Sequence, residues 1–175
     1  MDQSVIPECY VDTNLIETIV PAKGQYNHQK GCGTVTRVMQ EKFADRFAVG
    51  IIDKDKREVA YLKEFNEVHT AGSLILHKHK ARHHYIIQIN PAMERFILYN
   101  AEAADINVAD YGLPNDFDQF KRESKKVNTK DDPRFKRLFS DMHKAGVDDL
   151  QRLAAWITVL RQHTYNVDLA SIIAL

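Results

Sequence analysis

Short apolar runs and helical stripes of apolar residues alternate along the first half of the chain. A short run bounded by polar residues is typical of a strand, whereas apolar residues spaced three and four apart are typical of a helix. In chain order the pattern predicts a strand (4–9), a helix (12–20), a loop or weak strand (22–33), a helix (34–43) and a strand (47–52). The last run is almost continuously apolar and ends at Asp53, which is typical of a strand buried on both faces of a parallel sheet.

The second half becomes helical after two more apolar runs. The runs predict strands at 74–79 and 83–89, and Asn90 and Pro91 predict a helix start, with Asn as the N-cap and Pro in the first turn. Residues 105–114 are irregular, and the remaining stripes predict helices at 116–126, 133–145 (capped by Asp132) and 148–163. The apolar end, 169–175, predicts a segment that docks on its own core or on a partner.

These elements predict an α/β fold in which a mostly parallel sheet is flanked by helices. We expect residues 1–105 to form this α/β domain and residues 106–175 to form a helical extension packed on it as one compact unit. A chain of 175 residues with 44% hydrophobic and 27% charged residues fits a soluble globular domain and excludes wholesale disorder.

Composition narrows the compartment and the partners. No apolar run reaches the roughly 18 residues of a membrane span, and the first residues lack the basic and apolar regions of a secretory signal. The two cysteines, Cys9 and Cys32, make neither a disulfide framework nor a four-ligand zinc site, and we interpret them as buried or incidental thiols. We therefore expect a cytoplasmic protein with no membrane partner. Because 24 basic residues balance 24 acidic ones, only a local patch would bind a polyanion.

Acidic residues follow two of the predicted strands. Glu8 ends the first strand, with Asp12 one turn further on, and Asp53 and Asp55 follow the buried strand. Ligand sites in open parallel sheets lie outside the carboxyl ends of the strands. If these two strands are neighbours, the carboxylates converge, and a divalent cation such as Mg²⁺ or Mn²⁺ relieves their repulsion. The competing interpretation is a solvated turn, which is common for an isolated pair of aspartates two residues apart.

The order of these motifs resembles the Toprim domain. The segment 8–12 (Glu-Cys-Tyr-Val-Asp) opens a helix, a glycine-bearing turn follows at 31–33, and 49–55 reads Val-Gly-Ile-Ile-Asp-Lys-Asp. This fold is shared by topoisomerases, bacterial primases, OLD-type nucleases and small ribosomal-RNA maturation nucleases. The resemblance covers residues 4–57 and extends more weakly to 90–96, where Glu94 matches a glutamate at a helix start. Cys9 stands where the family commonly has glycine.

The resemblance implies a stand-alone Toprim protein, because 175 residues leave no room for a primase or topoisomerase module. It implies a metal-dependent nuclease that hydrolyses phosphodiester bonds in DNA or structured RNA, in nucleic-acid processing or anti-phage defence. Glu8, Asp53 and Asp55 would hold Mg²⁺ or Mn²⁺, with Glu8 also acting as general acid or base. Asp12 would be a supporting ligand, and Glu94 a further supporting acid. An ATPase or another protein subunit is the partner that the resemblance suggests, and a homo-oligomer is compatible with it.

Basic residues and histidines form the candidate nucleic-acid contacts. They lie directly after the buried strand and in the segment 76–84, and comprise Lys54, Lys56, Arg57, Lys78, Lys80, Arg82, His83 and His84. Two other interpretations of 76–84 stay open: an edge strand protected by charge, and a transition-metal site at His77 and His79.

Two other functions are compatible with the sequence. One is a non-catalytic Toprim-like nucleic-acid-binding or scaffold subunit, which the cysteine at position 9 favours and the intact acids disfavour. The other is a phosphatase-type or nucleotide-sugar enzyme, which ranks lower because its aspartate pair would be expected after the first strand.

Overall fold

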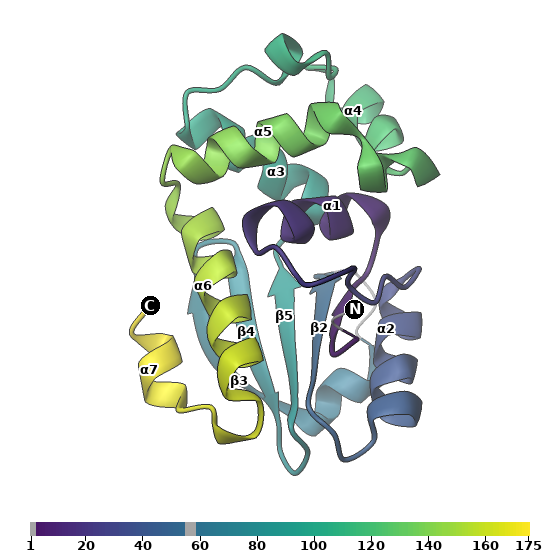
Figure 1. Ribbon diagram of the computed structural model, residues 1–175, viewed down its shortest axis with the longest axis vertical. Coiled ribbons are helices and arrows are strands. Elements are labelled where there is room, and N and C mark those ends of the chain that lie inside the picture. Colours follow the sequence, from purple (N-terminus) through teal and green to yellow (C-terminus); the bar gives the residue numbers. More distant parts are fainter. Residues whose placement is uncertain (1–2, 55–58) are drawn as a thin grey trace.

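The computed structural model describes residues 3–54 and 59–175, and its centre is a five-stranded sheet (Figure 1). The strands are β1 (Val5–Pro7), β2 (Ala48–Asp53), β3 (Phe65–Ala71), β4 (Leu74–His79) and β5 (His84–Ile89), in the order β1-β2-β5-β4-β3. β1 and β5 both pair with β2 in parallel, whereas β4 pairs with β5 and with β3 in antiparallel fashion.

The α/β class is confirmed, but the sheet is mixed rather than mostly parallel. Short turns connect β3 to β4 and β4 to β5, and strands joined in this way pair antiparallel because a parallel pair needs a longer crossover. β3 was not predicted from the sequence. Its residues are mostly polar, and most of them are at least partly exposed, because it is the edge strand of the sheet.

The helices are α1 (Tyr10–Ile19), α2 (Cys32–Val38), α3 (Met93–Ala103), α4 (Phe117–Ser124), α5 (Pro133–Lys144), α6 (Asp148–His163) and α7 (Leu169–Ile173). α2 continues as a π-helical turn over Met39–Phe43, and the 3-10 turns include Ala60–Glu64 and Val127–Asp131. Asp132 caps α5 as predicted, and Asp116, which was predicted to lie inside the helix, caps α4. Within the described ranges, no helix is long and apolar enough to cross a membrane.

The start of α3 differs from the prediction. The helix begins at Met93 with Ala92 as its N-cap, so Asn90 and Pro91 precede the helix instead of opening it. The peptide bond between Asn90 and Pro91 is cis, and the Asn90 N–H donates to Ser73 O (2.8 Å). Asn90 therefore still belongs to the end of the sheet.

Two hydrophobic cores lie on opposite faces of the sheet. On β2, Val49 and Ile51 face the larger core under α1, α3, α5 and α6, whereas Ala48 and Ile52 face the smaller core under α2. Gly50 points toward α2, where an added Cβ would lie 2.9 Å from Met39 Sδ. The close approach of α2 therefore depends on glycine at this position.

The larger core runs from β1 to the end of the chain. Ile172 of α7 is fully buried in it, and its carbonyl accepts a hydrogen bond from Trp156 Nε1 (3.1 Å). The predicted docking of the apolar end on its own core is therefore confirmed at Ile172.

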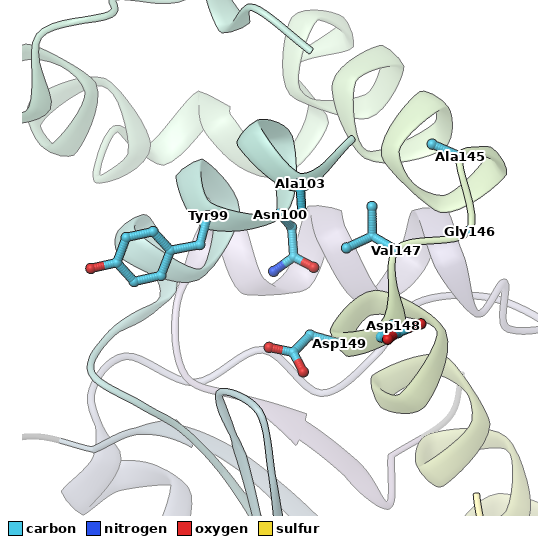
Figure 2. Close-up of a pocket in the computed structure, with 8 residues that line it drawn as sticks. All are labelled: Tyr99, Asn100, Ala103, Ala145, Gly146, Val147, Asp148 and Asp149. Carbon is cyan, nitrogen blue, oxygen red and sulfur yellow. The ribbon is translucent and has the colours of Figure 1, made fainter. Parts of the chain in front are cut away.

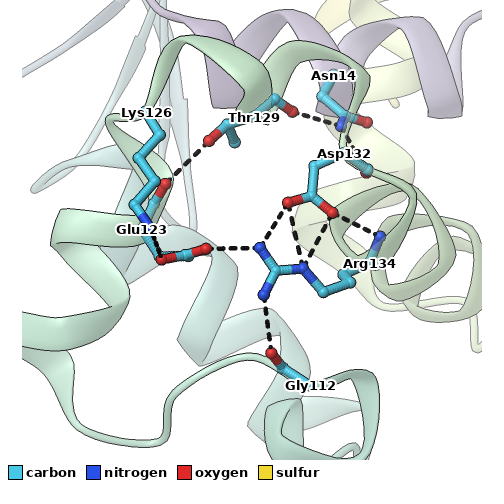
Figure 3. Close-up of polar contacts among 7 residues, drawn as sticks. All are labelled: Asn14, Gly112, Glu123, Lys126, Thr129, Asp132 and Arg134. Carbon is cyan, nitrogen blue, oxygen red and sulfur yellow. Dashed lines mark hydrogen bonds and ion pairs between the residues drawn. The ribbon is translucent and has the colours of Figure 1, made fainter.

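Buried polar contacts join α1 to the helices that follow α3 (Figure 3). Asn14 Nδ2 donates to Thr129 O (2.8 Å) and to Asp132 O (3.2 Å). Arg134 forms ion pairs with Asp132 (2.7 Å) and Glu123 (2.6 Å). α1 is thereby held between the sheet and α5, with its first turn at the carboxyl ends of the parallel strands (Figure 1).

Candidate functional site

Glu8 and Asp53 lie at one corner of the sheet, as the sequence predicts. β1 and β2 are parallel neighbours, with Pro7 opposite Ile51, so both strands end at the same edge. The Asp53 N–H donates to Glu8 Oε2 over 3.0 Å. The arrowhead of β2 in Figure 1 points toward α1, whose first turn supplies Asp12.

Asp12 is held by Cys9, the N-cap of α1. The carboxylate of Asp12 is only 1% exposed, and it accepts hydrogen bonds from Cys9 N (3.1 Å) and Cys9 Sγ (2.7 Å). Burial raises the pKa of the Cys9 thiol, and the negative charge of Asp12 raises it further. The thiol therefore remains protonated and can donate a hydrogen bond. Sequence reasoning assigned no role to this cysteine, although its spacing to Asp12 is that of a capping box.

Asp53 connects the sheet to α3. Its Oδ1 accepts a hydrogen bond from Met93 N (2.9 Å), at the first residue of that helix. The next residue, Glu94, is buried and accepts a hydrogen bond from Ser124 Oγ (3.2 Å) at the end of α4. The weakest part of the predicted acidic set, Glu94, therefore lies in the same region as Asp53.

The carboxylates act on one another electrostatically. The pKa of Asp12 is raised to about 7, chiefly by burial; the Cys9 hydrogen bonds lower it, and the charges of Glu8 and Glu94 raise it. The pKa of Asp53 is raised to about 8, chiefly by burial and then by the charges of Asp12 and Glu8, while the Met93 hydrogen bond lowers it. The charges of Glu8 and Glu94 thus oppose the ionisation of Asp12 and Asp53.

The acids of this corner offer carboxylate oxygens, which suit a hard divalent cation. Among residues 3–54 and 59–175, no three His, Cys, Asp or Glu side chains are already arranged around one ion. The predicted ligand Asp55 and the predicted phosphate contacts Lys56 and Arg57 lie outside the described residues. The described part of the site is therefore an acidic corner rather than a complete cage.

No family model, curated protein or solved structure matches this chain. The carboxylate corner must therefore be judged on its own geometry.

The basic segment around the β4–β5 turn lies at the opposite end of the strands from the acids, contrary to expectation. His84, the first residue of β5, pairs with Ala48 at the start of β2, whereas Asp53 pairs with Ile89. Five residues of strand separate the two ends by roughly 17 Å at about 3.3 Å per residue. Lys78, Lys80, Arg82, His83 and His84 surround the β4–β5 turn and cannot flank the carboxylates. They therefore do not lie beside the acids, where the sequence predicted phosphate contacts.

Lysines of this turn bind backbone carbonyls. Lys78 Nζ donates to the carbonyls of His79 and Arg82 and lies 5.1 Å from the centroid of the Tyr85 ring. Lys80 Nζ donates to Lys63 O (2.9 Å). These contacts fasten the turn to its surroundings.

The histidines of the turn bind different protein groups. His77 Nε2 contacts Gln88 Oε1 (2.8 Å), and His79 Nε2 contacts Glu64 Oε2 (3.1 Å). His84 Nδ1 shares a 2.6 Å hydrogen bond with Tyr61 Oη, and burial lowers the pKa of His84 to about 4. Because His77 and His79 point to separate partners, the structure offers no support for a shared metal between them.

Proposed function

We propose that the chain is a metal-dependent nuclease that hydrolyses phosphodiester bonds in DNA or structured RNA, with a Toprim-like arrangement over residues 4–57. The observation that carries the proposal is the acidic corner, in which Glu8, Asp12, Asp53 and Glu94 meet at the carboxyl ends of β1 and β2. Burying several carboxylates together is costly for a structural role, and a divalent cation offsets that cost.

The donor set fits Mg²⁺ or Mn²⁺. Glu8 and Asp53, with Asp55 of the segment outside the described residues, would hold the ion, and Asp12 and Glu94 would support it. When bound, a divalent cation lowers the pKa of a coordinated water and offsets negative charge on the phosphate.

Hydrogen-bond donors of the chain hold these acids in place. Asp53 N–H fixes one oxygen of Glu8, and Met93 N–H fixes one oxygen of Asp53. Cys9 fixes both oxygens of Asp12 through its N–H and thiol. Such second contacts hold catalytic carboxylates in one orientation. Glu8 is the group to which we assign proton transfer at the reacting oxygen.

Substrate contacts are better sought on the face of α3 and α4 than on the β4–β5 turn. Lys54 is exposed directly after β2. The Arg95 guanidinium lies 4.1 Å from the centroid of the Phe117 ring, and Lys121 Nζ lies 6.0 Å from it. Ser124 of α4 binds Glu94, so α4 lies beside the acids. Arg95 of α3 and Lys121 of α4 could therefore contact a phosphate backbone bound there.

The second candidate is a non-catalytic nucleic-acid-binding or scaffold subunit. The observation that favours it is the engagement of both Asp12 oxygens by Cys9, at the position where Toprim proteins commonly have glycine. In that case the acids would stabilise the start of α1 and would not support turnover.

The test compares cleavage and binding of labelled DNA and RNA by the full chain, with Mg²⁺, with Mn²⁺ and with a chelator. We expect metal-dependent cleavage that Glu8→Gln and Asp53→Asn reduce to the level seen with chelator. The matched controls Glu102→Gln and Asp110→Asn remove exposed acids elsewhere and should cleave normally. Binding without cleavage, unchanged in all four variants, would establish the scaffold function instead. Neither cleavage nor binding would refute both.

A further inference from the structure

A pocket of about 410 Å³ lies between the end of α3 and the start of α6, away from the acidic corner (Figure 2). It is lined by Tyr99, Asn100, Ala103, Ala145, Gly146, Val147, Asp148 and Asp149. Its volume is within the range of small-ligand sites. The proposed nuclease function does not use it, so the two can be tested independently.

Asn100 supplies a polar atom that has no partner. The side chain is 2% exposed, and its Nδ2 donates to Phe96 O over 2.7 Å, which fixes the orientation of the amide. Within the described part of the chain, Oδ1 is buried and accepts no hydrogen bond. Figure 2 shows this amide facing the space beside Val147 and Asp149. A buried acceptor without a donor is uncommon, and a ligand that donates a hydrogen bond would satisfy it.

The charges around the pocket select a cation. Its lining contains Asp148 and Asp149 and no basic residue. Asp149 already accepts a hydrogen bond from Ser73 N (2.9 Å) and lies 3.5 Å from Arg152, whereas Asp148 is exposed. A helix N-terminus such as that of α6 attracts anions, but these two aspartates occupy its first turn and repel them.

The end of α3 adds to this preference. A helix C-terminus carries partial negative charge, and cationic side chains commonly lie in the last turn to offset it. The last turn of α3 has no basic residue, and Ala103 in that turn lines the pocket. The lining of this pocket therefore includes an acceptor, an exposed aspartate and the C-terminal turn of a helix.

We propose that this pocket binds a cationic nitrogen group, either a guanidinium or an alkylammonium, that donates a hydrogen bond to Asn100 Oδ1. The same chemistry occurs in free amines and in the arginine and lysine side chains of peptides. The proposal concerns the cationic group that these molecules share, and the experiments below distinguish a free amine from a peptide side chain as its source.

The test titrates the ¹⁵N-labelled full chain with n-butylguanidinium and with its neutral isostere n-butylurea, up to tens of millimolar. We expect saturable NMR shifts at Ala103, Gly146 and Val147 with the cation and none with the urea. Agmatine and Nα-acetylargininamide then compare a free amine with a peptide-borne side chain, and saturable binding of either one supports the site. Absence of saturable shifts with n-butylguanidinium, or equal affinity for the urea, would overturn the proposal.

Variants separate the two recognition elements. Asn100→Leu removes Oδ1 at similar volume and should weaken n-butylguanidinium binding about ten-fold, the equivalent of one charge-assisted hydrogen bond. Asp148→Asn should weaken binding several-fold, whereas Asp110→Asn, an equal charge change at an exposed position outside the lining, should not. Unchanged affinity in Asp148→Asn and in folded Asn100→Leu would refute the proposal, and Asp148→Asn alone decides if Asn100→Leu does not fold.

Discussion

The contact between Asn14 and the turn Val127–Asp131 predicts a large loss of stability from a change of one amide group. Asn14→Asp keeps the shape of the side chain but replaces the Nδ2 donor with a carboxylate oxygen. That oxygen would face Thr129 O and Asp132 O, which lie 2.8 and 3.2 Å from Nδ2 in the structure (Figure 3). Since the side chain is 2% exposed, the new charge would be buried against two acceptors.

The magnitude follows from what each carbonyl loses. Asp132 O also accepts from Lys136 N (3.1 Å) and Thr129 O from Asp132 N (3.3 Å), so neither is left without a donor. Asn14→Ala should therefore cost only the two net hydrogen bonds, about 1–3 kcal/mol. Asn14→Asp adds a buried negative charge that faces these two carbonyl oxygens and should cost about 3–5 kcal/mol.

The assay is urea unfolding at neutral pH, followed by the fluorescence of Trp156, the single and fully buried tryptophan. The matched control is Asn128→Asp, which introduces the same charge at an exposed asparagine of the same turn and should change stability by about 0.5 kcal/mol or less. If Asn14→Asp and Asn128→Asp are equally stable, these hydrogen bonds do not hold α1 in place.

Three further predictions concern other parts of the molecule. Mg²⁺ should raise the melting temperature of the wild-type chain, by the equivalent of about 2.7 kcal/mol at a Mg²⁺ concentration a hundred times Kd. In chelator, Asp53→Asn should melt at a higher temperature than the wild type, and Mg²⁺ should not raise that temperature further. If Mg²⁺ stabilises the variant as much as the wild type, the ion binds elsewhere. Because the pKa of buried His84 is about 4 in the folded state and about 6.5 in the unfolded chain, the unfolded state takes up the proton first, and stability should fall by roughly 2 kcal/mol from pH 7 to about pH 5. Unfolding curves of His84→Gln should lose this part of the pH dependence, and an unaltered profile would contradict the assignment. Gly72→Ala should cost about 1–3 kcal/mol, since φ is +55° and the new Cβ would collide with the Asp149 carboxylate, whereas Gly33→Ala meets no atom within 4 Å and should be tolerated in the same melting assay.

Much of the fold was predictable because its elements have strong periodicity. The strand 74–79 and the helix 148–163 have the predicted bounds, and the other long helices differ by a few residues. β3 was missed because its apolar residues do not alternate cleanly, although Gly72 and Ser73 before Leu74 are a hairpin signal. The sheet is mixed because the β3–β4 and β4–β5 turns are too short to connect parallel strands.

The candidate site was predictable in part. Glu8 and Asp53 came together because parallel neighbouring strands end at one edge, which sequence order alone suggests. The position of Lys80 and His83 depends on the direction of the strands that flank them, which cannot be predicted from a pattern of charges. Only the short turn between β4 and β5 places these residues at the far edge. The hydrogen bonds from Cys9 to Asp12 were not predicted, because they form within one turn of helix and leave no periodic signal in the sequence.

The placement of α1 between the sheet and α5 has a consequence for synthesis. The outer side of α1 (Tyr10–Ile19) is covered by a helix that begins at Pro133, more than a hundred residues later in the chain. At a ribosomal rate of about 5–20 residues per second, that side waits on the order of ten seconds for its cover. The side of α1 that α5 covers in the folded protein is therefore exposed on the nascent chain during this interval, when a chaperone could bind it.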